Sequence, residues 1–450
     1  MFATRKVEPA RPVADGAGDG GSAAGPVSLF VAVFIVTMIG RPSEWIPGLQ
    51  SIPVSRIAFL IAAIAAFRLA STLSPIRLMS LPGIKSALLF MGLAVLSFVF
   101  SIYKSKTLEV MPGPLTLLLA IVLLVKAIPT VRDAERILVA MVISALALTI
   151  GTLRVYQGGR AEIGTEYSSY DPNDLAFVLV SILPICFALF TVSTGLKKLM
   201  LLGGIVAMLF CMLLTGSRGG MVALGLVALL FTFKPIALQD DGRLKEVRAG
   251  SAIVRVAALL MAAVVAWFVA PPEIKDRLKT FTDLGSDYNM SMTDNSSRLL
   301  VWSRNSMAVV KRPIGFGLGT ANAVDGMLGG QFKTAHNTLV QTLVELGFLG
   351  LILLLRGFYV SWRDLQIAER RARDEVQPPT AVQSRIALYS RALRLSLVGC
   401  LSAGFFLSQA YGPTLWMLIA ICGVFVGLQR TCGGEAPEAR PARRRPQKSA

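Results

Sequence analysis

Residues 175–234 read LAFVLVSILPICFALFTVSTGLKKLMLLGGIVAMLFCMLLTGSRGGMVALGLVALLFTFK, and this stretch indicates the fold of the chain. Three apolar runs, 175–193, 199–215 and 219–234, follow one another here and are separated only by short links. A helix that crosses the hydrocarbon core of a bilayer needs about 20 largely apolar residues, or somewhat fewer where its neighbours pack closely. The stretch therefore predicts three membrane-spanning helices joined by tight turns.

The composition of the whole chain also indicates a membrane protein. Apolar residues make up 54% of its 450 residues and charged residues 16%, whereas charged residues make up about 25% of an average soluble domain. The candidate spans, including the three above, are 27–40, 56–71, 86–103, 113–128, 137–153, 175–193, 199–215, 219–234, 253–271, 338–361, 392–411 and 413–429. We therefore predict an all-α fold, a polytopic membrane helix bundle of about twelve transmembrane helices with one large periplasmic loop.

The orientation follows from the positive-inside rule, which places most Lys and Arg of short loops in the cytoplasm. With twelve spans and the N-terminus inside, 30 of the 45 Lys and Arg residues lie inside and 15 outside, eight of them in one long loop. The expected organisation is a disordered cytosolic leader (1–26), helices 1–9 (27–271), a periplasmic loop with a short helix (272–337), helices 10–12 (338–429) and a basic cytosolic tail (430–450).

The charge and the cysteines exclude several classes of function. The net charge of +18 is concentrated on the predicted inner side, where basic residues set topology beside anionic lipid, so we expect membrane lipids and no nucleic acid as partners. None of the five cysteines forms a CxxC pair, so we expect neither a disulfide nor a metal site. The chain also lacks a Walker loop and the HExxH and GxSxG motifs, and no cofactor is expected.

Two polar residues at the predicted outer boundary are candidates for chemistry. His336, in TAHNT (334–338), is the only histidine, and its unperturbed pKa of about 6.5 suits it to proton transfer near neutrality. Arg218, in GSRGG (216–220), lies where two spans leave room only for a tight turn, so its guanidinium is costly unless it is paired or hydrated. A structural histidine and a snorkelling arginine that ends a helix are the alternatives.

Arg298 is the third candidate, at the start of a predicted helix (298–311) that Ser297 can cap. Arginine suits a diphosphate because its planar donors match phosphate oxygens two at a time and it stays charged. Arg304 is six residues from Arg298 and so points away from it on a helix. Arg304, Lys311 and Arg312 are therefore expected to be surface or headgroup contacts, and Arg304→Ala should cost little activity.

The glycines of GFGLG (315–319) suggest a nucleotide-binding loop, but their context does not. No strand precedes them, and they follow a helix on the predicted outer side, where nucleoside triphosphates are scarce. We expect a turn that returns the chain to the membrane.

Taken together, several motifs resemble the O-antigen ligase and Wzy-type polysaccharide polymerase superfamily, membrane glycosyltransferases of bacterial envelopes. The motifs are PNDLA (172–176), TGSRGG (215–220), Ser297-Arg298 with Trp302, PIGFGLG (313–319), HNTL (336–339) and ELGFLG (345–350). They cover about residues 170–355 in the order and spacing of the family, whereas the first 150 residues match only as a row of spans.

The resemblance implies a GT-C-like architecture in the bacterial inner membrane, with the active site facing the periplasm. A polyprenyl-diphosphate-linked glycan would be the donor, Arg218 and Arg298 would bind its diphosphate, and His336 would assist attack by an acceptor hydroxyl without a metal. The residues agree with this, because the energy for transfer already resides in the glycosyl diphosphate. The acceptor stays open among the lipid A core, a growing glycan and a protein hydroxyl.

A polysaccharide flippase or another transporter would suit twelve spans equally well. Against it, no internal repeat relates the two halves, and the candidate polar residues gather at the outer mouth rather than at mid-membrane. A passive structural subunit of an envelope complex would leave the outer arginines without a purpose.

The charge distribution generates a topological prediction that does not depend on the resemblance. Reporter fusions after Lys198, near Lys245 and at the C-terminus should report cytoplasm, and a fusion near Asp287 should report periplasm. A periplasmic C-terminus would contradict the even number of spans.

Overall fold

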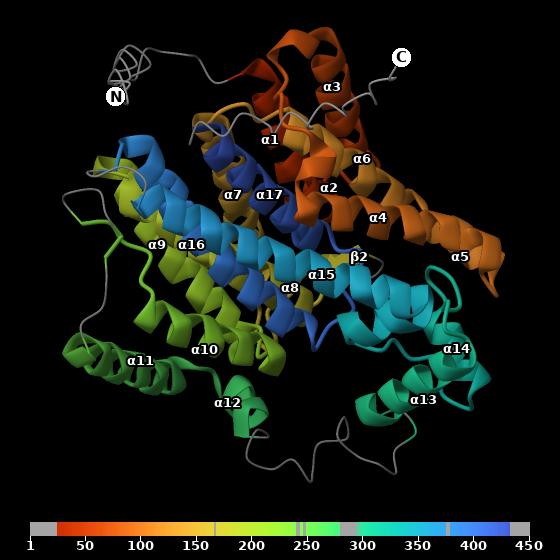
Figure 1. Ribbon diagram of the computed structural model, residues 1–450. Helices are drawn as coiled ribbons and strands as arrows, with labels where there is room; N and C mark the ends of the chain where they lie inside the picture. The colour runs from red at the N-terminus through yellow and green to blue at the C-terminus, as the bar shows by residue number, and fades with distance from the viewer. Residues whose placement is uncertain are drawn as a thin grey trace, which may run out of the picture.

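The computed structural model describes residues 25–165, 168–239, 244–245, 249–279, 295, 297–374 and 379–432. These residues form a nearly all-helical bundle, in which most long helices run side by side (Figure 1). The predicted leader, apart from its last two residues, and the tail beyond residue 432 lie outside the described residues.

The helices follow one another along the whole described chain, interrupted by one short hairpin. Their bounds are α1 (Pro26–Gly40), α2 (Pro42–Trp45), α3 (Val54–Arg68), η2 (Ala70–Thr72), η3 (Leu78–Ser80), α4 (Pro82–Leu96), η4 (Ser97–Phe100), α5 (Lys104–Val110), α6 (Pro112–Lys126), α7 (Val131–Val155), α8 (Pro172–Val192), α9 (Gly195–Leu214), α10 (Arg218–Phe233), α11 (Ala249–Val269), α12 (Pro272–Lys279), α13 (Arg298–Lys311), α14 (Ala321–Met327), α15 (Thr338–Asp374), α16 (Ala381–Gly404) and α17 (Pro413–Cys432). Strands β1 (Ile163–Thr165) and β2 (Ser168–Tyr170) pair antiparallel between α7 and α8.

The protein is a polytopic helical membrane bundle. Within the described ranges, nine helical segments are long and apolar enough to cross a membrane. Each of the twelve predicted spans overlaps a helix, but α1, α3 and α10 have only 15 or 16 residues. Whether these three helices also cross the membrane stays a prediction.

Polar residues at the helix starts explain why several helices begin where they do. Thr130 caps α7, Asp171 caps α8, Ser217 caps α10 and Ser297 caps α13, each by accepting a hydrogen bond from a backbone N–H of the first turn. Thr380 caps α16 in a reciprocal capping box with Gln383. Such caps satisfy N–H groups that have no partner inside the helix.

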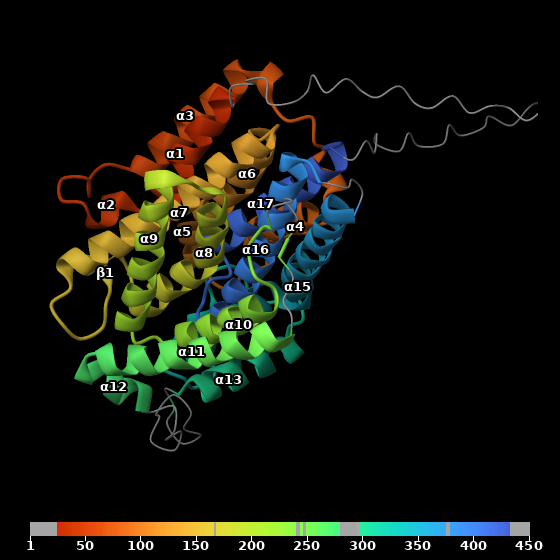
Figure 2. The same ribbon diagram turned by 90° about the vertical axis from the view of Figure 1, so that its left-hand side faces the viewer.

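The core of the bundle lies around α8, α16 and α17, whose residues are mostly buried. Helix α16 packs against α8, α10, α15 and α17. By contrast, α11 exposes its apolar side chains along its whole length, as a lipid-facing helix does. In the view of Figure 2, α11, α12 and α13 lie together at one end of the bundle.

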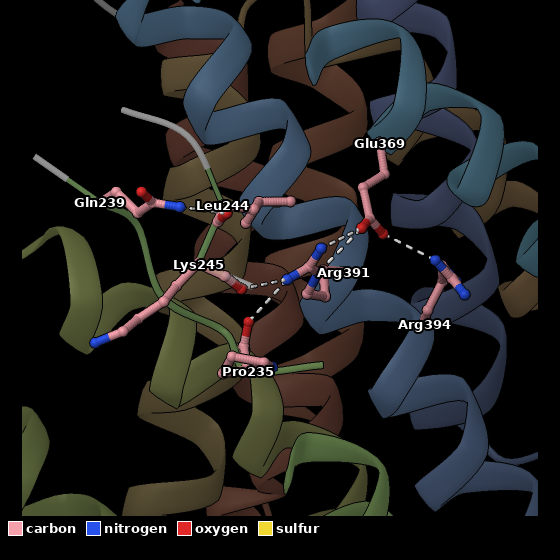
Figure 3. Close-up of polar contacts among 7 residues, drawn as sticks. All are labelled: Pro235, Gln239, Leu244, Lys245, Glu369, Arg391 and Arg394. Atoms are coloured by element: carbon pink, nitrogen blue, oxygen red, sulfur yellow. Dashed lines mark hydrogen bonds and ion pairs between the residues drawn. The ribbon is translucent and has the colours of Figure 1, made fainter. Parts of the chain in front are cut away.

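A buried ionic network ties α15, α16 and the segment after α10 together inside the bundle (Figure 3). Glu369 of α15 accepts hydrogen bonds from Arg391 (2.7 and 3.0 Å) and from Arg394 (2.8 Å) of α16. Arg391 also donates to the carbonyl oxygens of Pro235 (3.1 Å) and Lys245 (3.4 Å). These two bonds hold the segment after α10 against the bundle. Removal of one charged member of the network would leave a buried charge without its partner, which is strongly destabilising.

The glycine-rich strip before α14 docks into a break in α15. Gly347 interrupts the helix with φ 66° and ψ −164°, and the backbone of the strip pairs with this break. The hydrogen bonds are Phe316 N to Val344 O, Gly317 N to Glu345 O and Phe348 N to Pro313 O, at 2.9 to 3.1 Å. The glycines of GFGLG therefore serve close backbone packing in a turn, which agrees with the rejection of a nucleotide loop.

Gly317 is the position at which this docking is most sensitive to a side chain. Its φ is +104°, and a Cβ atom would lie 2.5 Å from the Cβ of Ser101. The left-handed backbone conformation and the close contact with Ser101 both make any side chain at position 317 unfavourable. Gly317→Ala should therefore lower the free energy of unfolding by about 1–3 kcal/mol. Thermal unfolding of the purified protein in detergent measures this.

Gly225→Ala is the matched control, because that glycine lies in α10 with open space around it. It should leave the unfolding temperature unchanged or slightly raised, since alanine favours a helix. Equal effects of the two substitutions would contradict the docking argument.

Candidate functional site

A polar pocket of about 180 Å³ opens where several helix ends meet. It is lined by Arg160, Asn173, Arg218, Gly219, Arg277, Arg298, His336 and Phe406. The three residues singled out from the sequence, Arg218, Arg298 and His336, thus lie in one pocket although 118 positions separate the first from the last. They come from the start of α10, the start of α13 and the loop before α15.

Arg218 enters the pocket as the first residue of α10. Ser217 caps the helix by accepting a hydrogen bond from Gly220 N (3.2 Å) and donates one to the Asn173 side chain (2.9 Å). Gly219 lets α10 approach Phe406, because a Cβ there would lie 2.6 Å from the Cβ of Phe406. The start of a helix carries a partial positive charge, so α10 adds to the attraction of the pocket for anions.

Arg298 enters as the first residue of α13, whose bounds agree with the capping serine predicted from the sequence. Trp302, one turn later, donates its indole N–H to the carbonyl oxygen of Ala335. It also packs edge-to-face on Phe405, with ring centroids 5.5 Å apart. The start of α13 is therefore held between the loop that carries His336 and the end of α16.

His336 is half-buried and has an unusual backbone, with φ 44°. Its Nε2 atom lies 2.8 Å from the Thr334 hydroxyl. Burial, followed by the positive charges of Arg298 and Lys333, lowers the pKa of His336 below its ordinary value, although Asp171 acts in the opposite direction. The imidazole is consequently neutral at physiological pH and can accept a proton.

Two further arginines in the pocket were given no role in the sequence analysis. Arg160, in the loop after α7, donates to Thr215 O (2.9 Å) and to the Asn173 side chain (3.1 Å). Burial, together with the nearby charge of Arg277, lowers the pKa of Arg160 to about 10, so it stays protonated at neutral pH. Arg277 of α12 donates to Gly216 O (3.1 Å).

A signal for these residues was present in the sequence. Arg160 and Arg277 are among the minority of basic residues that the predicted topology places outside. Asn173 belongs to the PNDLA motif, but its contact with Arg160 and Ser217 depends on the packing of α8 against the start of α10. Sequence spacing alone could not supply that contact.

The expectation that Arg304 is a surface or headgroup contact is wrong. Its guanidinium forms an ion pair with Asp325 at 2.7 Å, and the carboxylate is fully buried. Arg312 also makes an internal contact, by donating to Phe100 O and lying over the Phe316 ring at 5.4 Å. Loss of Arg304 would leave a buried carboxylate without its partner, so Arg304→Ala cannot serve as a neutral control.

The lining favours an anionic ligand. Among its described residues are four arginines and one histidine, and no carboxylate. Guanidinium groups bind phosphate oxygens in pairs. A group of three or more His, Cys, Asp or Glu side chains that could hold a metal ion is not found in the described part of the chain.

Residues 203–355 match the family model described as O-antigen ligase. This segment is similar to the O-antigen ligase family domain. The match confirms the resemblance, and its range includes three of the four pocket arginines, Arg218, Arg277 and Arg298, together with His336. Arg160 and Asn173 lie before it. A search of curated proteins finds no match to this chain.

Proposed function

We propose that this chain is a membrane glycosyltransferase of the ligase or polymerase type, which transfers a polyprenyl-diphosphate-linked glycan to an acceptor hydroxyl. The family match supports an O-antigen ligase or polymerase type of membrane function. The observation that carries the finer proposal is the gathering of Arg218, Arg298 and His336 in one polar pocket. The charge split of the sequence supports a pocket that faces the periplasm and a location in the bacterial inner membrane.

In the proposed reaction, the acceptor oxygen attacks the anomeric carbon of the donor sugar. The bond from that carbon to the diphosphate breaks, and the diphosphate leaves with the electron pair. Arg218 and Arg298 stabilise the negative charge that develops on it, and His336 takes the proton of the acceptor hydroxyl. A single displacement of this kind inverts the configuration at the anomeric carbon.

The place of the pocket favours this proposal over transport. Its lining comes from residues at or beyond the ends of α8, α10, α13 and α16, rather than from the middle of the bundle. A transporter binds its substrate near the middle of the membrane. The acceptor is a lipid A core, a growing glycan or a protein hydroxyl.

The arginines are tested by complementation of a deletion strain. Arg218→Ala and Arg298→Ala should each lower transfer by at least about 10²–10³-fold, because each removes a donor to the developing charge. High-molecular-weight glycan should be lost and lipid-linked intermediates should accumulate, while the protein stays in the membrane in near-normal amount. Arg→Lys should restore activity only in part, since lysine keeps the charge but lacks the two-pronged geometry.

Arg68→Ala is the matched control, because Arg68 is an exposed arginine at the end of α3. It should support normal glycan assembly. Full activity of Arg218→Ala would remove the central element of the proposed mechanism.

His336 is tested by the dependence of turnover on pH. Transfer should fall as the pH drops through the pKa of His336, because a protonated imidazole cannot accept a proton. Since that pKa is lowered, the midpoint of the loss should lie below the ordinary value of about 6.5. His336→Ala should lose about 10²–10⁴ in rate but still bind the donor. If the variant keeps the wild-type rate and pH profile, His336 is a structural cap and not a base.

A further inference from the structure

Arg304 of α13 is the centre of a polar cluster next to the pocket but outside its lining. Its Nε donates to Asp325 Oδ1 of α14 (2.8 Å). Its two terminal nitrogens donate to the side chain and to the carbonyl oxygen of Asn295, both at 2.9 Å. The guanidinium therefore connects the chain three residues before Arg298 to α14.

Asp325 also accepts hydrogen bonds from the loop that leads to His336. Its Oδ2 accepts the backbone N–H of Lys333 (3.1 Å), and its carbonyl oxygen accepts that of Gly330 (2.9 Å). The Asn295 side chain in turn donates to Gly329 O (3.0 Å). The turn 329–333 is thus folded around one buried carboxylate.

The same helix holds this loop a second time, closer to His336. Trp302 donates to Ala335 O, directly before His336, and Asn337, directly after it, caps α15 through bonds to Leu339 N and Val340 N. The left-handed backbone of His336 lies between these two anchors. The imidazole position consequently depends on how the preceding turn is held.

We propose that Arg304 and Asp325 are a positioning pair that fixes the guanidinium of Arg298 relative to the imidazole of His336. Neither residue lines the pocket, and together they carry no net charge, so their contribution is geometric. A displacement of about 1 Å between reacting groups can cost about 10²-fold in rate. The effect on rate rests on the proposed function, whereas the effect on geometry does not.

The single histidine allows the geometry to be measured without any substrate. The rate of carbethoxylation by diethyl pyrocarbonate, followed against pH, reports the pKa and the accessibility of His336 alone. The groups whose charges act on it are Arg298 of α13, Asp171 before α8 and Lys333 of its own loop. Asp325 is not one of them. Its replacement by Asn leaves the charge of Arg304 unpaired, which by itself would lower the pKa of His336, so a rise in that pKa reports movement of the loop.

Asp325→Asn is the main variant, because the amide group replaces one of the two carboxylate oxygens with an NH2 donor. The asparagine side chain therefore cannot accept hydrogen bonds at both positions, from Arg304 and from Lys333. Once the loop is released, the imidazole becomes more hydrated and moves away from Arg298, so its pKa should rise toward the ordinary value and carbethoxylation should become faster. The rate of glycan transfer should fall by about 10²-fold.

Arg304→Lys is the second variant, since it keeps the charge beside Asp325 but loses the donors to Asn295. It should shift the pKa of His336 in the same direction and provides the test if Asp325→Asn does not fold. Glu109→Gln is the control for an acid-to-amide change, because Glu109 is exposed and pairs with Lys106 one turn away. Thermal unfolding of the full-length protein in nanodiscs confirms that each variant is folded.

The outcomes separate this inference from the proposed function. Folded variants in which His336 keeps the wild-type pKa and carbethoxylation rate would overturn the positioning role. A shifted pKa with unchanged transfer would support the positioning role and contradict the role proposed for His336 in catalysis. A shifted pKa with slower transfer supports both.

Discussion

Mutual repulsion among four guanidinium groups is the constraint on which the architecture of the pocket depends. One small pocket is lined by Arg160, Arg218, Arg277 and Arg298. Like charges gathered in one pocket oppose folding unless other groups compensate them. Backbone carbonyl oxygens supply part of that compensation, since Thr215 accepts from Arg160 and Gly216 from Arg277. The positive electrostatic potential that remains in the pocket favours binding of an anion, which agrees with the diphosphate of the proposed donor.

Holding these charges together requires irregular backbone, which a membrane protein tolerates only where its polar groups are satisfied. The pocket accordingly lies where turns meet, after α7, α9 and α16 and before α13 and α15. The break in α15 follows the same principle, because the strip before α14 supplies the hydrogen bonds that the helix gives up around Gly347. Glycines in both segments make the close approach of the two backbones possible.

Helix α10, which carries Arg218, is anchored at both ends. At the pocket, Ser217 caps it and bonds to Asn173. At its other end, the Pro235 carbonyl accepts from Arg391 in the network of Figure 3. Arg391 lies 13 residues before the end of α16, roughly 20 Å along the helix axis from the pocket. A buried ionic network in the bundle and a polar pocket at its end therefore share the same two helices, α10 and α16.

The pattern of apolar runs was sufficient to predict the helical membrane fold and the approximate ranges of the long helices, and three of the polar residues chosen from the sequence lie in the pocket. Long apolar runs have few alternatives in a bilayer. Arg218 was conspicuous because charge is costly at the membrane boundary, His336 because it is the single histidine, and Arg298 because an arginine at the start of a helix suits a diphosphate. Motif spacing also indicated a resemblance to the O-antigen ligase family, and the match over 203–355 confirms that resemblance.

Which other residues lie beside these three in the pocket depends on tertiary packing. Arg160 and Asn173 reach the pocket because α8 packs close to the start of α10, and Arg277 reaches it because α12 folds back onto Gly216. Arg304 was misjudged for the same reason. Helical spacing showed that it points away from Arg298, but a buried carboxylate on α14 lies on the side to which it points. Contacts between segments distant in sequence depend on packing, and no local pattern encodes them.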